Sequence, residues 1–328
     1  MTPEESQAIA FAGAVFVSNL DTLVFSCALF GIYMSAFTVS IRILLQREHH
    51  TLAHKALIGI LLAGFVMTVL YNSQNIVVNL FLVKFGVVTS LPGGLIAQET
   101  VADSKCIVPT LLQEWSGNFI VLLADMAIAW RAWALWADNR LIKWPLLIML
   151  LIDIAVNTAS NLADTLAYFP LITQVANAVT LNWVGVVLNF GVNIAATLLI
   201  AYRAWKHHHS VHVILHKKQT QVGAILLLMV ESGAILGVVQ VCCIVINVLE
   251  IHAANPSPIN TAKVFLGALY TYSAAINPVA LVILVQTGNT YEDSFHLEDL
   301  PSLDINSAHM TSLGTQHPLG SHEVEGYF

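Results

Sequence analysis

The sequence predicts an all-α, polytopic membrane protein: a seven-transmembrane-helix bundle with its N-terminus outside the cell and its C-terminus in the cytosol. Seven apolar stretches each reach the length of about 20 residues that a helix needs to cross a bilayer. The chain is 57% hydrophobic and 10% charged, whereas a soluble domain carries about 25% charged residues. The stretches cover residues 22–45, 57–83, 111–136, 144–168, 181–204, 222–249 and 264–285.

Basic residues are divided unequally between the two sides of the predicted bundle. One set of alternate loops holds ten of the 13 Lys and Arg residues, and the opposite set holds Lys84, Lys105 and Lys263. Because Lys and Arg near span ends favour the cytosolic side, the larger set is expected inside. A plasma membrane location is expected. The ten are Arg42, Arg47, Lys55, Arg131, Arg140, Lys143, Arg203, Lys206, Lys217 and Lys218.

The spans divide the chain into three predicted parts. Residues 1–21 form an extracellular N-terminal segment, residues 22–286 the transmembrane domain, and residues 287–328 a cytosolic tail. The tail is rich in Ser, Thr, His and acids and poor in large apolar residues, which predicts disorder. The longest outer connection is expected at about residues 84–110, and it contains Cys106.

The second and third spans carry polar residues on one face. Asn72, Asn75 and Asn79 are spaced by three and four residues, which places them on one side of a helix. In the third span, Asn118 and Asp125 lie seven residues apart, with Asp125 near the expected middle of the bilayer. Lipid cannot satisfy such groups, so these faces are expected to point into the bundle.

The fourth and fifth spans repeat this pattern over a longer distance. Their polar residues recur at spacings of three, four or seven, so each set shares one helix face. The fourth span holds Asp153, Asn157, Asn161 and Asp164, and the fifth holds Asn182, Asn189 and Asn193.

Two helices contain candidate hinges. Gly233 and Gly237 in the sixth span form a pair of small residues typical of close helix packing. In the seventh span, Pro278 removes a backbone hydrogen bond and predicts a kink. Gly237 and Pro278 are therefore the predicted conformational hinges.

The buried amides and acids leave two interpretations open. The Asn residues either form hydrogen bonds between helices or line a water-filled cavity that binds a ligand. Asp125, Asp153 and Glu231 have no Lys or Arg at the same expected depth, so they are either protonated or matched by a cation. Glu231 and Gln240 of the sixth span are expected to face the interior. The hypothetical ligand-binding residues are Asn79, Asp125, Asp153, Asn157, Asn189 and Glu231.

Several function classes lack their signatures. The sequence has no His-Glu-x-x-His, Gly-x-Ser-x-Gly or phosphate-loop motif, so neither an enzyme nor a cofactor is expected. It also lacks the basic stripe of a nucleic-acid binder. His208, His212 and His216 recur every four residues. This spacing permits metal ligation, a pH-sensitive charge or a basic loop on anionic lipid, but no Cys or acid joins them and no metal site is predicted.

The inner end of the third span carries a recognisable motif. Asp125 is followed by Trp130-Arg131-Ala132-Trp133 and by a further tryptophan, Trp136. This pattern resembles a large family of seven-helix membrane proteins from mushroom-forming (basidiomycete) fungi, and the resemblance implies the fold over about residues 20–286. A looser similarity is to G-protein-coupled receptors, which carry Asp/Glu-Arg-Tyr where this chain has Trp-Arg-Ala.

The favoured function is that of a receptor-like protein that senses a small extracellular molecule or cation. The ligand would bind in the polar interior and signal to a cytosolic partner. A proton- or cation-coupled transporter, or an ion pathway, is the alternative, and a membrane scaffold without a ligand is a third. A polar pocket closed on the inner side favours the receptor, whereas a polar tunnel open to both faces favours transport.

Overall fold

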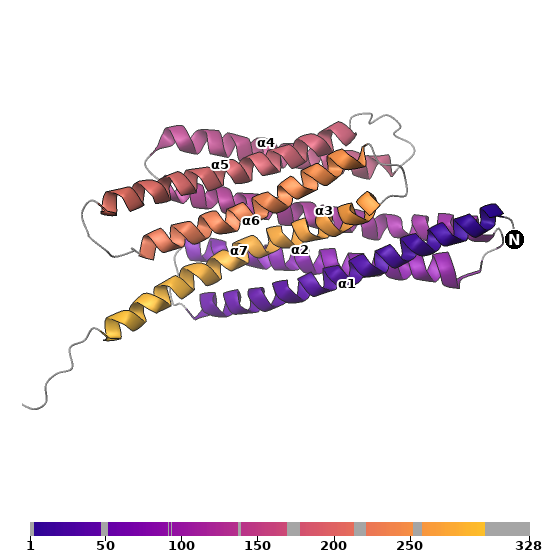
Figure 1. Cartoon of the computed structure of the whole chain (residues 1–328), viewed down its shortest axis with the longest axis horizontal. Helices are drawn as coiled ribbons and strands as arrows, with labels where there is room; N and C mark the ends of the chain where they lie inside the picture. The colour runs from indigo at the N-terminus through magenta and orange to yellow at the C-terminus, as the bar shows by residue number, and fades with distance from the viewer. Residues whose placement is uncertain are drawn as a thin grey trace, which may run out of the picture. The chain divides into compact units, whose positions relative to one another are not determined.

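The computed structural model of the chain is entirely helical, with short turns, over the residues that it describes (Figure 1). These are residues 3–46, 52–90, 92, 94–136, 139–168, 178–212, 221–251 and 258–298. The chain divides into two units, Met1–Asn289 and Thr290–Phe328, and all contacts described below lie in the first. The elements are α1 Pro3–Leu45, α2 Leu52–Val83, the π-helical η1 Lys84–Val88, α3 Gly94–Leu135, α4 Arg140–Ala167, α5 Ala178–His212, α6 Gln221–Glu250 and α7 Pro258–Glu298.

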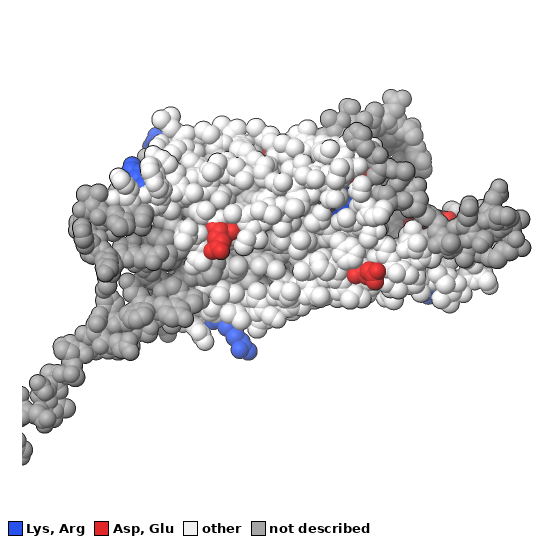
Figure 2. All heavy atoms as spheres, in the orientation of Figure 1, with Lys and Arg blue, Asp and Glu red and all other residues white. Residues whose placement is uncertain are grey.

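All seven α-helices contain a segment long and apolar enough to cross a membrane, which confirms the predicted fold class. Large apolar side chains such as Val24, Val66 and Leu198 are exposed on the outside of the bundle. The face in Figure 2 carries only a few isolated acidic and basic side chains between the two ends. Such a surface suits hydrocarbon, because lipid has no polar groups to pair with charges. The segments are Gly13–Leu45, His54–Val88, Ala97–Leu135, Arg140–Ala167, Leu181–Lys206, Leu226–Glu250 and Pro258–Ile283.

Successive helices of the first unit run in opposite directions (Figure 1). The end at which α1, α3, α5 and α7 begin is called here the N-terminal end, and the other is the opposite end. Helix α3 packs closely on α2, α4 and α5, and supplies core residues such as Ile120 and Ile128. Helix α7 differs, because among the described residues its Cα atoms make at most isolated approaches within 8 Å of another helix.

The expected long outer loop does not exist. Helix α2 continues through η1 to Val88, and α3 begins at Gly94, whose φ of 70° suits glycine. Cys106 is therefore a buried residue of α3, with its Sγ 3.7 Å from the carbonyl oxygen of Val78. The placement of Cys106 in a loop was wrong because polar residues lower the hydropathy of this stretch without ending the helix.

Helix extends into both parts that were predicted to flank the transmembrane domain, residues 1–21 and 287–328. Helix α1 starts at Pro3, so it runs through the predicted N-terminal segment without a break. Helix α7 continues to Glu298, so residues 287–298 are helical where the sequence suggested disorder. The rest of the predicted tail, residues 299–328, lies outside the described residues.

Side-chain hydrogen bonds and a ring contact attach α7 to the bundle. The Tyr272 hydroxyl donates to Asn72 Oδ1 of α2 at 3.0 Å, and the Tyr272 ring makes an edge contact with Tyr71, with centroids 5.9 Å apart. Ser40 of α1 donates from Oγ to the carbonyl oxygen of Val279 at 2.9 Å. These contacts join α7 to α1 and α2.

Replacing Ser40 with alanine is expected to lower the free energy of unfolding by about 1 kcal/mol, because a fully buried bond between α1 and α7 is lost. Ser35→Ala is the matched control, since Ser35 is exposed and donates to the Gly31 carbonyl of its own helix. Thermal unfolding of the purified protein in detergent compares the two. Equal midpoints for both variants would contradict the role given to Ser40.

Candidate functional site

A buried set of polar side chains joins α4, α5 and α7 in the middle of the bundle. Asn157 Nδ2 lies 2.9 Å from both Asp153 Oδ1 and Asn189 Oδ1. Asn189 Nδ2 in turn donates to the Tyr270 hydroxyl at 3.3 Å. If the Asn189 amide is turned by 180°, its nitrogen lies 3.2 Å from Asp153 Oδ2, so it links α4 to α5 in either orientation.

Helix α6 joins the same set through Gln240, which is 2% exposed. Asn193, one turn beyond Asn189 on α5, donates from Nδ2 to Gln240 Oε1 at 2.9 Å and to the Gly233 carbonyl at 3.2 Å. Gln240 and Asn189 both lie against the Tyr270 hydroxyl. Asp153, Asn157, Asn189, Gln240 and Tyr270 are together called the polar layer.

Asp125 of α3 lies beside this layer. Its side chain is 1% exposed, and its Oδ1 has no hydrogen-bond partner among the described residues. Its carboxyl group is within electrostatic reach of both Asp153 and Tyr270. The structure therefore brings together four of the residues proposed from sequence: Asp125, Asp153, Asn157 and Asn189.

The other two proposed residues lie elsewhere. Asn79 is half-buried on α2 and donates to the Asn75 carbonyl at 2.9 Å. Glu231 is exposed on α6, so the expectation that it faces the interior was wrong. Glu231 and Gln240 are nine positions apart, which amounts to about 900° of helix rotation and puts the two side chains on opposite faces.

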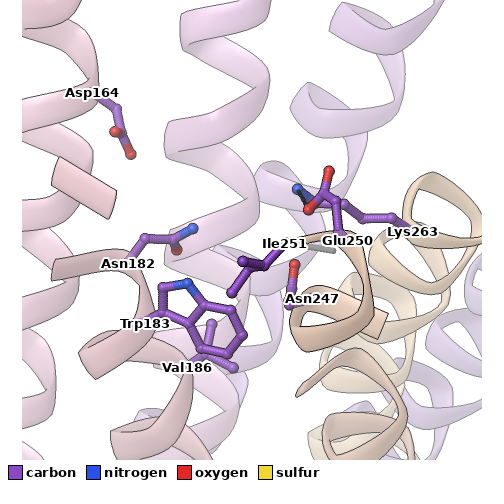
Figure 3. A pocket seen from close by; sticks show the side chains of 8 residues that line it. All are labelled: Asp164, Asn182, Trp183, Val186, Asn247, Glu250, Ile251 and Lys263. Carbon is purple, nitrogen blue, oxygen red and sulfur yellow. Dashed lines mark hydrogen bonds and ion pairs between the residues drawn. The ribbon is translucent and has the colours of Figure 1, made fainter. Parts of the chain in front are cut away.

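A cavity of about 370 Å³ opens at the N-terminal end of the bundle, among α4, α5, α6 and α7 (Figure 3). Asp164 stands on one side of the cavity, and Glu250 and Lys263 stand on the other. Lys263 Nζ and Glu250 Oε2 form an ion pair at 2.6 Å. The lining residues are Asp164, Asn182, Trp183, Val186, Asn247, Glu250, Ile251 and Lys263.

The cavity is in register with the polar layer. On each of the four helices, a residue of the cavity lies seven positions from a residue of the layer, which is about two turns and 10 Å along the same helix face. The pairs are Asp164 and Asn157 on α4, Asn182 and Asn189 on α5, Asn247 and Gln240 on α6, and Lys263 and Tyr270 on α7. The polar layer therefore lies about two helical turns deeper in the bundle than the cavity.

Tyr168 and Glu114 stand close to Asp164 at this end. The Tyr168 hydroxyl is within hydrogen-bond reach of Glu114. Partial burial, together with the carboxylates of Glu114 and Asp164, raises the pKa of Tyr168 above its usual value. Its hydroxyl therefore remains a neutral donor at pH 7.

Toward the opposite end, Arg131 of α3 reaches α7. Its side chain is buried, and Nη2 donates to the Asn277 carbonyl at 3.2 Å while Nη1 lies 3.5 Å from Asn277 Oδ1. This contact is immediately next to Pro278. Buried apolar residues such as Ile128 and Val279 surround the region between Asp125 and Arg131.

Sequence reasoning missed Tyr270, Trp183, Asn247 and the part played by Lys263. Lys263 and Tyr270 are seven residues apart, which indicates that they share one helix face. However, a tyrosine in an apolar span is usually predicted to be a core residue. The histidine repeat leads to no site in the described chain: α5 includes His212, whereas His216 lies outside the described residues. Those described residues contain no group of three or more His, Cys, Asp or Glu side chains placed to hold a metal.

The fold and the distribution of polar groups define an integral, polytopic membrane protein with seven spanning helices. Comparisons with models of protein families, with curated proteins and with solved structures return no match. The roles discussed below therefore rest on the geometry of this chain.

Proposed function

We propose that the protein is a receptor-like membrane protein that takes a small ligand into the cavity at its N-terminal end. The observation that supports this most directly is the register between the cavity and the polar layer on α4, α5, α6 and α7. With the orientation expected from the basic residues, the cavity opens to the exterior. The motif around Arg131 fits the lineage of fungal seven-helix proteins, and no catalytic role is proposed.

Helix α7 is the proposed transmitter of the signal to a cytosolic partner. It carries Lys263 in the cavity, Tyr270 in the polar layer and the Arg131 contact at Asn277. Its residues Tyr272, Ala274 and Val279 are buried in the core, so a shift of α7 would move side chains that pack against the neighbouring helices. Pro278, which leaves an intrahelical carbonyl without its usual donor, is the proposed hinge.

Helix α6 supplies the second proposed hinge. A Cβ at Gly237 would lie 3.5 Å from Asn193 Nδ2 and 3.7 Å from Ile194 Cδ1, so α5 and α6 approach closely here. A rotation of α6 about this contact would move Gln240 relative to Asn193 and Tyr270. A ligand in the cavity could then change the hydrogen bonds of the polar layer.

A cation-coupled transporter is the second candidate, and Asp125 supports it. A carboxyl group with an unpartnered oxygen, buried next to Asp153, can carry a proton or bind a cation. However, toward the opposite end Ile128, Ala132 and Val279 are apolar and buried, and the buried Arg131 side chain is bonded to Asn277. This packing between α3 and α7 favours the receptor over a transport path.

Filling the cavity tests the proposal. Val186→Trp, from inside the cavity, is expected to abolish ligand-induced stabilisation, because the larger ring occupies the space that the ligand needs. Val187→Trp is the matched control, since Val187 is 54% exposed on the outer face of α5. The purified chain in liposomes is screened with small ammonium, carboxylate and neutral compounds for thermal stabilisation and for uptake.

Compounds that bind are expected to stabilise the wild type and Val187→Trp, but not Val186→Trp, and to remain outside the liposomes. If Val186→Trp responds as the wild type does, the cavity is not the binding site. Accumulation of a stabilising compound inside the liposomes would instead identify a transporter.

A further inference from the structure

The N-terminal end of the bundle is acidic. In the described chain it carries three basic residues, Lys84, Lys105 and Lys263, and a larger number of acids. The opposite end holds the other basic residues of the described helices. A surface with one sign of charge around a cavity raises the local concentration of ligands with the other sign. Of the acids at this end, Asp164 and Glu250 line the cavity, whereas Glu99, Asp103 and Glu114 lie on α3.

Within the cavity, the one lysine is already neutralised. Lys263 pairs with Glu250 at 2.6 Å, whereas Asp164 forms no ion pair within the described part of the chain. Asp164 is also within electrostatic reach of a second acid, Glu114 of α3. The uncompensated charge that faces the cavity is therefore negative and is centred on Asp164.

The rest of the lining suits an organic body rather than a bare ion. Trp183, Val186 and Ile251 lie between Asp164 on one side and the Glu250–Lys263 pair on the other (Figure 3). An indole ring attracts cations through its face as well as packing against apolar groups. The volume of about 370 Å³ falls within the range typical of small-molecule sites.

We infer that the cavity binds a small organic ammonium compound, with its charged nitrogen at Asp164 and its apolar body against Trp183, Val186 and Ile251. This inference rests on the proposed function and specifies its ligand class. The amides of Asn182 and Asn247 accept hydrogen bonds from the ammonium group or from a second polar group of the ligand. An anion would meet the uncompensated carboxylate of Asp164, and a bare metal ion would meet an apolar wall.

Three probes with the same aromatic body and different head groups test the inference: phenethylammonium, phenethyl alcohol and 3-phenylpropionate. The full chain in lipid nanodiscs is expected to bind phenethylammonium most tightly, as measured by calorimetry. Asp164→Asn is expected to weaken that binding about tenfold or more, because a charge-assisted hydrogen bond is lost. Asn182→Asp, which adds a carboxylate to the cavity, is expected to strengthen it.

Asp103→Asn is the matched control, because it removes the same charge from an exposed position on α3 at the same end. It is expected to change binding less than about twofold, as screening weakens the effect of distant exposed charges. Equal affinity of Asp164→Asn and the wild type, preference for the alcohol or the carboxylate, or no binding of phenethylammonium would overturn the inference. If the preferred probe is not an ammonium but its binding is abolished by Val186→Trp, the cavity remains the ligand site and only the ligand class is wrong.

Discussion

Replacing Gly233 with alanine is expected to lower the free energy of unfolding by about 2 kcal/mol, because overpacking a close helix contact forces side chains and backbone apart. A Cβ at this position would collide with Thr197 Oγ1 of α5 and would lie 3.2 Å from its Cγ2. The branched Thr197 side chain is 8% exposed and has little room to turn away. Gly233 also presents its carbonyl to Asn193, so separation of the helices strains that hydrogen bond.

Two further variants isolate the cause of this effect. Gly237→Ala lies one turn away on the same face, where the added Cβ meets its nearest atom at 3.5 Å, and it is expected to be nearly neutral. Combining Gly233→Ala with Thr197→Ala removes the colliding atoms and is expected to recover part of the loss. Unfolding monitored with a thiol-reactive dye measures all three, and an unchanged midpoint for Gly233→Ala would refute the proposed α5–α6 packing.

Asn157→Leu is expected to cost about 2 kcal/mol as well, because it removes the donor that lies 2.9 Å from Asp153 Oδ1 and the contact of Asn157 with Asn189. Burial makes this loss larger than that of an exposed hydrogen bond, since Asp153 is 0% exposed and Asn189 is 4% exposed. The variant is also expected to reduce ligand-induced stabilisation, because Asn157 lies directly below Asp164 on α4. Thermal unfolding with and without the best probe separates the two effects.

Asn161→Leu is the matched control on the same helix. Its Nδ2 is buried without a hydrogen-bond partner in the described part of the chain, so the same substitution removes an unsatisfied group. The expected change is within about 0.5 kcal/mol. If both leucine variants lose the same stability, the hydrogen bonds of Asn157 do not account for its effect.

Hydropathy was sufficient to predict the seven spans, because a bilayer demands long apolar segments from any helix that crosses it. It was not sufficient to place the ends of the helices. The stretch around Cys106 contains acids and a lysine, so its hydropathy predicts a loop, whereas these residues suit a helix that extends into water. Amino-acid composition indicates whether a segment lies in lipid or in water. It does not indicate where the helix starts, which depends on backbone hydrogen bonds.

The candidate site was predictable where the spacing of polar residues within a single helix places them side by side. Asp153 and Asn157 share a face because they are four residues apart, and the structure places them in contact. The prediction for Glu231 was wrong because Glu231 and Gln240 lie on opposite faces of α6, so only Gln240 points into the bundle. The cavity could not be predicted, because it depends on how Asp164, Trp183 and Lys263 of three different helices are rotated toward one another.

Arg131 has a consequence for how the protein responds to acid. Its guanidinium group binds a main-chain oxygen and a carboxamide of Asn277, and neither acceptor takes up a proton in the physiological range. A contact of this kind holds equally well in a neutral and in an acidified compartment. Sensitivity to pH is therefore expected to originate at the carboxylates of the N-terminal end and the interior, while the contact between Arg131 and Asn277 stays indifferent to it.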